Sequence, residues 1–280
     1  MTLNTYEFSF NGLVMNGTNA YGVIAIDGLS PPDRREESID KAEDHGAYVY
    51  AAFLSPRRIV IEGDIVGLVG DDFEADVTAW RRAFVPQVSP LPFTYLLPGD
   101  GDITKQIFCV PTRSALAVDS EYPLGYAKWH VELLAGDPRI YDMGSTITQG
   151  AGTANGLGFN IQFNVNFGGG SSSAASAGYN NIGIFPTPAT AKLHGPMTNP
   201  EIRNNTVGKS IKMNIDIATG DALWVDFASK TLKMNGTVSK YGTLSSDSEW
   251  WQLEPGVNDI ALTVDAGTGQ MELFYRSAWI

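Results

Sequence analysis

The chain has one cysteine, three histidines and no long apolar run, and each of these features excludes a class of structure or function. Cys109 is the only cysteine among 280 residues, so no intrachain disulfide can form. Its neighbours in residues 106–110 have the composition of a strand interior, which predicts a buried structural thiol and not a nucleophile. No stretch reaches the roughly 18 consecutive apolar residues that a membrane-spanning helix needs. The first residues also lack a basic segment followed by an apolar one, so we expect synthesis in a cytoplasm and no membrane anchor.

The residue patterns of common catalytic and metal sites are also missing. His45, His130 and His194 lie far apart and form no His-x-x-x-His pair, so a zinc site has no local support. The segment 207–210 is similar to the end of a phosphate-binding loop, but Arg203 occupies the position of the required upstream glycine. There is no Gly-x-Ser-x-Gly nucleophile elbow, and the carboxylates are scattered. We therefore expect a protein that is not an enzyme, with no catalytic residues, no metal and no cofactor.

Basic residues are outnumbered by acidic ones, mostly in the first half of the chain. The formal net charge is −12, of which −10 falls in residues 1–143 and −2 in residues 144–280. An acidic surface repels phosphate backbones, so the net charge does not support nucleic-acid binding. An acidic surface equally keeps a protein soluble, so the net charge alone does not indicate a function.

The first half is predicted to consist of strands with one helix. Alternating apolar and polar residues predict strands over residues 6–10, 21–26, 58–66, 93–97, 105–110, 114–118 and 127–134. Phe73, Val77, Trp80 and Phe84 recur at helical spacing, with acidic residues before them and Pro86 after them. Residues 31–46 are rich in charges of both signs, which predicts an exposed loop or the tip of a long hairpin.

The second half is predicted to be a β-sandwich. Residues 158–167 alternate strictly between apolar and polar side chains, which places one face on a core and the other toward water or a partner. Further strands are expected over residues 210–217, 221–227 and 275–280, and Asn235-Gly236 predicts a type I′ hairpin turn. Residues 143–158 are mostly glycine, threonine, alanine, serine and asparagine, a composition that predicts a domain boundary close to residue 143. We therefore expect two domains, residues 1–143 and 144–280.

Aromatic residues of the second half offer the one pattern that suits a ligand. An exposed tryptophan can stack on a sugar ring, and Trp224 and Trp250 are the candidates for a glycan-facing position. Core packing is the competing interpretation, and it is strongest for Trp251 and Trp279. Trp250 and Trp251 are adjacent, so on a strand only one of them can point inward.

Several sequence blocks together resemble a known family. They are His194–Thr206, Gly220–Asp226, Asn235-Gly236, Ser248–Ile260 and the terminal Tyr275–Ile280. In order and spacing, these blocks are similar to the distal tail proteins, often labelled minor tail proteins, of long-tailed, siphovirus-type bacteriophages. The similarity covers the whole second half, while the first half is similar only in outline.

The resemblance implies a structural protein of the viral tail tip that is part of the virion after synthesis in the host cytoplasm. Residues 1–143 would form a tail-tube-like β-barrel with one helix that closes into a homo-hexameric ring. Residues 144–280 would form a galectin-like or carbohydrate-module-like β-sandwich. The partners would be the tail-tube protein, a tail-tip hub protein and the tape measure protein, with DNA passing through the lumen without specific binding.

Three functions therefore compete at this stage. The first is a hexameric hub ring that connects the tail tube to the host-recognition apparatus. The alternative is a carbohydrate-binding module that contributes to adsorption on a host-surface glycan. The third, an unrecognised hydrolase, requires converging titratable groups, and the sequence supplies no candidate set.

Overall fold

The computed structural model describes residues 3–17, 19–35, 38–49, 53–67, 72–99, 101–153 and 175–280. The chain divides into two compact units, residues 1–143 with Ile280 and residues 144–279. Both units consist mainly of strands, and the described residues contain one α-helix. The expected mainly β fold is confirmed.

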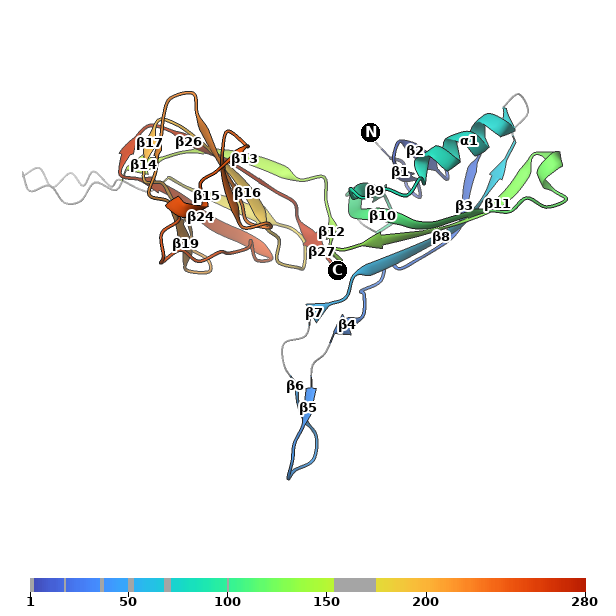
Figure 1. The fold of residues 1–280 in the computed structure, drawn as a ribbon, viewed down its shortest axis with the longest axis horizontal. Coiled ribbons are helices and arrows are strands. Elements are labelled where there is room, and N and C mark those ends of the chain that lie inside the picture. Colours follow the sequence, from blue (N-terminus) through green and yellow to red (C-terminus); the bar gives the residue numbers. More distant parts are fainter. Residues whose placement is uncertain are drawn as a thin grey trace, which may run out of the picture. The chain divides into compact units, whose positions relative to one another are not determined.

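The first unit is built on a sheet with the strand order β2-β1-β9-β10-β11-β8-β3 (Figure 1). Neighbouring strands pair antiparallel. The path is open between its end strands β2 and β3 in the described residues, so the closed barrel that the resemblance implies is not present in this chain alone. The strands are β1 (Phe8–Phe10), β2 (Leu13–Met15), β3 (Tyr21–Asp27), β8 (Arg57–Val66), β9 (Leu91–Tyr95), β10 (Lys105–Leu116), β11 (Tyr126–Ala135) and β12 (Ile140–Tyr141), which pairs with β10.

The predicted helix is confirmed as α1 (Phe73–Ala83), which lies against one face of this sheet (Figure 1). The Asp72 side chain caps it by accepting bonds from the amides of the second and third helical residues. Its apolar stripe packs into the sheet, because Trp80 and Phe84 lie 6.1 and 6.2 Å, ring centre to ring centre, from Trp129 of β11. Phe84 also stacks on Phe10 of β1 at 5.4 Å. The helix and the residue that follows it thus pack against both β1 and β11 in one aromatic core. A 3₁₀ turn, η1 (Tyr122–Leu124), precedes β11.

The charged segment between β3 and β8 is a two-stranded arm. Two short antiparallel pairs form it, β4 (Arg34–Arg35) with β7 (Phe53–Leu54), and β5 (Ser38–Asp40) with β6 (Ala47–Val49). Figure 1 shows it as a narrow ribbon that continues the β3–β8 hairpin. Of the two sequence interpretations, the tip of a long hairpin is the one that the structure adopts.

One prediction in the first unit was wrong in its boundaries. Residues 105–110 and 114–118 were expected to be two strands, yet β10 runs unbroken from Lys105 to Leu116. A register shift between Pro111 and Arg113 accommodates the proline, which cannot donate a ladder hydrogen bond. The break in the sequence pattern is a bulge and not a turn.

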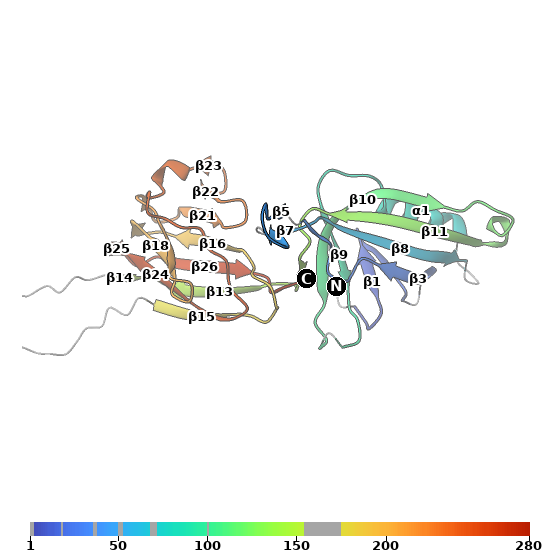
Figure 2. The same cartoon turned by 90° about the horizontal axis from the view of Figure 1, so that it is seen from below.

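The second unit contains two large sheets. The first has the order β13-β26-β16-β21-β22-β23, which can be followed in Figure 2. Its strands are β13 (Ser145–Gly150), β16 (Ala189–His194), β21 (Ala222–Asp226), β22 (Thr231–Met234), β23 (Val238–Ser239) and β26 (Gln270–Tyr275). The second has the order β14-β24-β18-β19 with β15 also on β24, and comprises β14 (Gly152–Thr153), β15 (Ala175–Asn181), β18 (Glu201–Asn204), β19 (Lys209–Lys212) and β24 (Gly256–Val264).

The two sheets enclose one apolar core, as in a sandwich. Leu193, Leu223 and Leu273 contribute to it from the first sheet, and Ile202 and Ile260 contribute from the second. A third, small sheet contains β17 (Met197–Thr198), β20 (Asp216–Ile217) and β25 (Ala266–Gly267). The remaining elements are the 3₁₀ turn η2 (Tyr241–Thr243) and the last strand β27 (Ala278–Trp279).

The strand predictions for this unit have mixed outcomes. The hairpin turn is confirmed, because Asn235 and Gly236 have φ values of 51° and 75° between β22 and β23. Residues 210–217 are not one strand, since β19 and β20 belong to different sheets. The alternating stretch 158–167 lies outside the described residues.

Candidate assembly and ligand-binding surfaces

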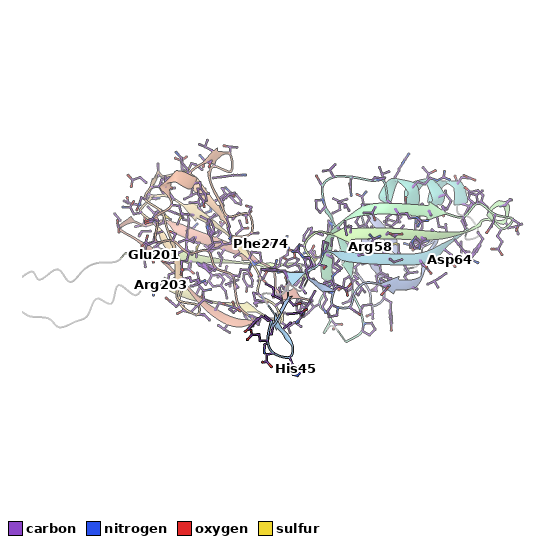
Figure 3. All side chains as sticks on the ribbon, turned by 60° about the horizontal axis from the view of Figure 1, so that its bottom comes forward. His45, Arg58, Asp64, Glu201, Arg203 and Phe274 are labelled. Carbon is purple, nitrogen blue, oxygen red and sulfur yellow. The ribbon has the colours of Figure 1, made fainter. Side chains whose placement is uncertain are left out.

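The three histidines occupy separate places. His45 lies at the end of the arm (Figure 3), His130 on β11 and His194 on β16. In the part of the chain that the structure describes, no group of three or more histidine, cysteine or acidic side chains is placed to hold a metal ion. Cys109 is fully buried, and burial raises the pKa of its thiol to about 12, as a structural thiol requires. No described helix is long and apolar enough to cross a membrane.

A charged network covers the sheet face of the first unit that is opposite α1. Glu132 of β11 accepts a bond from Arg58 of β8 at 2.5 Å and lies 3.5 Å from both Arg113 and His130. His130 lies 3.5 Å from Glu62 on its other side. Desolvation raises the pKa of Glu132, but the bonds from His130 and Arg58 outweigh it and hold that pKa below its usual range. Figure 3 shows Arg58 on this sheet.

The arm carries exposed apolar side chains. Ile39 and Tyr48 are directly opposite each other in the β5–β6 pair and are 57% and 60% exposed. Phe53 at the arm's base is 63% exposed. Covering exposed apolar side chains stabilises a complex by roughly 25 cal/mol for each Å² of apolar surface removed from water. These three side chains are therefore suited to contact with a partner.

Trp224 lies on the outer face of the first sheet of the second unit and is 40% exposed. Its cross-strand neighbours are Lys192 of β16 and Lys233 of β22. The Lys192 ammonium lies 5.2 Å from the centre of the Trp224 ring, a cation–π contact. Trp224, Lys233 and Gly236 border a shallow hollow of about 170 Å³. Trp224 is thus exposed to solvent, and its role in glycan binding stays a prediction.

Trp250 borders a different and larger hollow of about 340 Å³, which we call the Trp250 hollow. Its floor includes Phe227 and Trp251, and its rim carries Lys209, Lys230 and Glu254. Trp250 packs edge-on against Phe227 at 5.6 Å, whereas Trp251 is 4% exposed and part of the core. Trp250 is half-buried and also packs against the core, and neither tryptophan lies on a strand.

The structure does not place the two candidate tryptophans in one site, because they border separate hollows. The sequence also gave no sign of the lysines beside each of them. Lys233 reaches Trp224 through strand pairing, and Lys209 reaches the Trp250 hollow from 41 residues away in sequence. The first of these pairs depends on the turn over residues 227–230 between β21 and β22, which no sequence pattern indicated.

Comparisons with known proteins agree with this architecture. Residues 182–279 match the model of the siphovirus-type tail component family, C-terminal domain. One similar solved structure is the crystal structure of the SPP1 Dit protein, described as a paradigm of the hub adsorption apparatus in phages that infect Gram-positive hosts. The match covers 99% of this chain and all of the SPP1 Dit chain, with a TM-score of 0.67 and 15% sequence identity. The phage P2 baseplate in its activated conformation with Ca contains a similar chain, with a TM-score of 0.55, 8% identity and 97% coverage of each chain.

The search of curated proteins found no match to this chain. The family match nevertheless spans the second unit from Ile182 to Trp279, and it includes all the sequence blocks that suggested a phage tail protein except the final residue. The solved structures extend the likeness of fold to the first unit. Residues 182–279 therefore match a siphovirus-type tail component domain, as the sequence blocks predict, and the chain as a whole shares the fold of the SPP1 Dit protein.

Proposed function

We propose that the chain forms a hexameric ring that joins the tail tube to the host-recognition apparatus at the tip of a phage tail. The observation that carries the proposal is the combination of a tail component domain over residues 182–279 with the SPP1 Dit fold over 99% of the chain. In this role, residues 1–143 are the tail-tube-like ring-forming domain and residues 144–280 the outer, galectin-like sandwich. The contribution is structural and includes no catalytic step.

The open sheet of the first unit supports assembly between copies. Its end strand β3 pairs on one side only in the described residues, and Ile24 in that strand is 65% exposed. An unpaired strand edge exposes backbone donors and acceptors that a neighbouring chain can satisfy. Repeating one such contact around an axis closes a ring.

The arm is the second element that we assign to the interface. It exposes Ile39, Tyr48 and Phe53, and none of its described side chains is buried. An arm of this kind would gain stability by laying these side chains on the neighbouring subunit. Its charged residues would then fix the register of the contact.

The partners in this proposal are the tail-tube protein on one side, a tail-tip hub protein on the other, and the tape measure protein and DNA in the lumen. The sheet face opposite α1 supports passage without binding. On it, the acidic side chains lie beside an equal number of basic ones, so their charges neutralise one another: Glu62, Asp64 and Glu132 with Arg58, Arg113 and Lys128. A surface of this composition offers phosphate groups no net attraction.

Measuring the mass of the purified protein by light scattering tests the proposal. The expected result is six times the chain mass, and removal of residues 33–44 should lower it. The double variant Ile39→Asp and Tyr48→Asp should do the same without shortening the chain. Val257→Asp, at an exposed position of the second unit, is the matched control and should leave the mass unchanged. An unchanged hexamer with normal tails after the deletion would remove the arm from the interface.

Carbohydrate binding by the second unit is a second candidate function, which the ring does not exclude. It is supported by Trp224, which is 40% exposed among polar side chains, and by Trp250, which borders a hollow. Saturable binding to host wall glycans that is lost on Trp224→Ala or Trp250→Ala would establish it. Unchanged binding in both variants would count against either tryptophan as a glycan platform.

A further inference from the structure

The Trp250 hollow has an aromatic floor and a basic rim on an otherwise acidic protein. Phe227 and Trp250 supply apolar ring surface, and the hollow of about 340 Å³ is at the lower end of the size of small-ligand sites. Lys209 and Lys230 lie on its rim, and neither forms an ion pair with any described residue. Glu254 is the single acidic side chain at the rim, so the local charge is positive while the chain carries −12.

Buried asparagines hold the segment that carries Trp250 in one conformation. The Asn204 amide donates to the carbonyl of Gln252 at 3.3 Å, while its oxygen accepts from the amides of Thr206 and Val207. Asn258 donates to the carbonyl of Glu254 at 2.7 Å and accepts from the amide of the same residue at 2.9 Å. Both asparagines are fully buried.

A third buried asparagine holds the same segment, since the Asn181 side chain donates to the carbonyls of Phe185 and Leu253. The segment 250–254 thus remains irregular although strands surround it. Burying polar side chains is favourable only when their hydrogen bonds are made, and a satisfied network fixes one conformation. The walls of the hollow are therefore rigid before any ligand arrives, which lowers the entropic cost of binding.

The turn that carries Lys230 is also fixed. Lys230 has φ of 54°, a left-handed conformation that residues with side chains rarely adopt. The Asp226 carboxylate accepts bonds from the amides of Ala228 and Ser229 at 2.9 and 3.2 Å, which stabilises the turn between β21 and β22. The lysine is thereby placed at the rim of the hollow by the backbone and not by a salt bridge.

We propose that the Trp250 hollow binds one unit of an anionic saccharide, a sugar ring that carries a carboxylate or a phosphate group. The ring stacks on the aromatic surface of Trp250, and the anionic group lies between Lys209 and Lys230. A neutral sugar would leave both ammonium groups without a partner, and a simple anion would leave the aromatic surface in water. This proposal goes beyond the hub role and gives the second candidate function a ligand class and a place.

The test titrates the purified full-length protein with D-glucuronic acid, with glucose 6-phosphate and with D-glucose, and follows the tryptophan indole N–H resonances by NMR. The two anionic probes should bind saturably, and about tenfold more tightly than glucose, because only they meet both lysines. Trp250→Ala should abolish binding. Lys209→Gln and Lys230→Gln should each weaken the anionic probes about threefold and leave glucose unaffected.

Trp224→Ala is the matched control, because this tryptophan is exposed and borders the other hollow, so binding should be unchanged. Lys230→Gln alters an exposed side chain and keeps the proposal testable if Trp250→Ala fails to fold. Equal binding of glucose and the anions would overturn the ligand class. Binding that survives Trp250→Ala, or no saturation by any of the three probes, would overturn the site. The mass of the same samples reports on the hub ring independently.

Discussion

Among the charged side chains that the structure describes in the first unit, Arg57 is the most deeply buried, and it offers a sharp test of how the arm is held. The residue is 1% exposed and forms no ion pair with any carboxylate that the structure describes. Instead, its guanidinium donates to three backbone carbonyls: Gly28 and Ser30 at 2.6 Å, and Pro138 at 2.9 Å. Burial lowers the pKa of this guanidinium from its ordinary value. These bonds join the start of β8 to the base of the arm and to the segment before β12.

Replacing Arg57 with methionine keeps much of the apolar stem and removes the donors. Three part-buried hydrogen bonds are then lost, at about 1 kcal/mol each, so the first unit should lose about 3 kcal/mol of its free energy of unfolding. With a urea dependence of roughly 2 kcal/mol per molar, the midpoint should fall by about 1.5 M. The urea midpoint of Arg57→Lys should lie between those of the wild-type protein and Arg57→Met, because an ammonium group cannot reach three carbonyls in a planar arrangement.

The assay is urea unfolding followed by tryptophan fluorescence, with Arg58→Met as the matched control. The Arg58 side chain is 63% exposed and forms a surface pair with Glu132, so its loss should cost less than about 1 kcal/mol. If Arg57→Met and Arg58→Met unfold at the same urea concentration, the assignment of Arg57 as the anchor of the arm's base is wrong.

Three further predictions concern the core of the first unit. Gly63→Ala should be strongly destabilising, because an added Cβ would overlap the carbonyl of Gly22 and the indole of Trp129, whereas Gly136→Ala meets open space and should change the melting temperature little. A thiol reagent at pH 8 should label Cys109 only at the rate at which the first unit opens, so labelling should accelerate with urea, and fast labelling of the native protein would contradict its burial. Burial, and then the charge of Asp76, raise the pKa of Tyr21 to about 12. The contribution of Tyr21 to stability is therefore complete below pH 10 and falls as the pH rises from 10 toward 12. Tyr21→Phe should flatten this part of a plot of stability against pH, and an unchanged slope would refute the shift.

The elements that could be predicted from sequence are those with local causes. The stripe from Phe73 to Phe84 together with an acidic cap specifies α1 without help from the rest of the fold. The Asn235-Gly236 turn is equally local, because both residues readily adopt positive φ. Both signals act between residues that are close in sequence, which is the range that a sequence pattern can report.

The features that could not be predicted depend on distant partners. A proline at 111 predicts a break, but pairing with β11 continues through it by a bulge. Residues 210–217 have one strand pattern, yet tertiary pairing assigns them to two sheets. The Trp250 hollow brings together Lys209, Phe227 and Trp250, whose convergence follows from the packing of the sandwich and not from any spacing in the sequence.

In the proposed ring, the first unit completes its sheet only beside identical copies. Negative-stain electron microscopy of the purified protein, combined with its mass by native mass spectrometry, is the decisive experiment. The expected result is six-fold annuli with a mass six times that of the chain. Single particles with the mass of one chain, at every concentration and in the presence of other tail components, would contradict it.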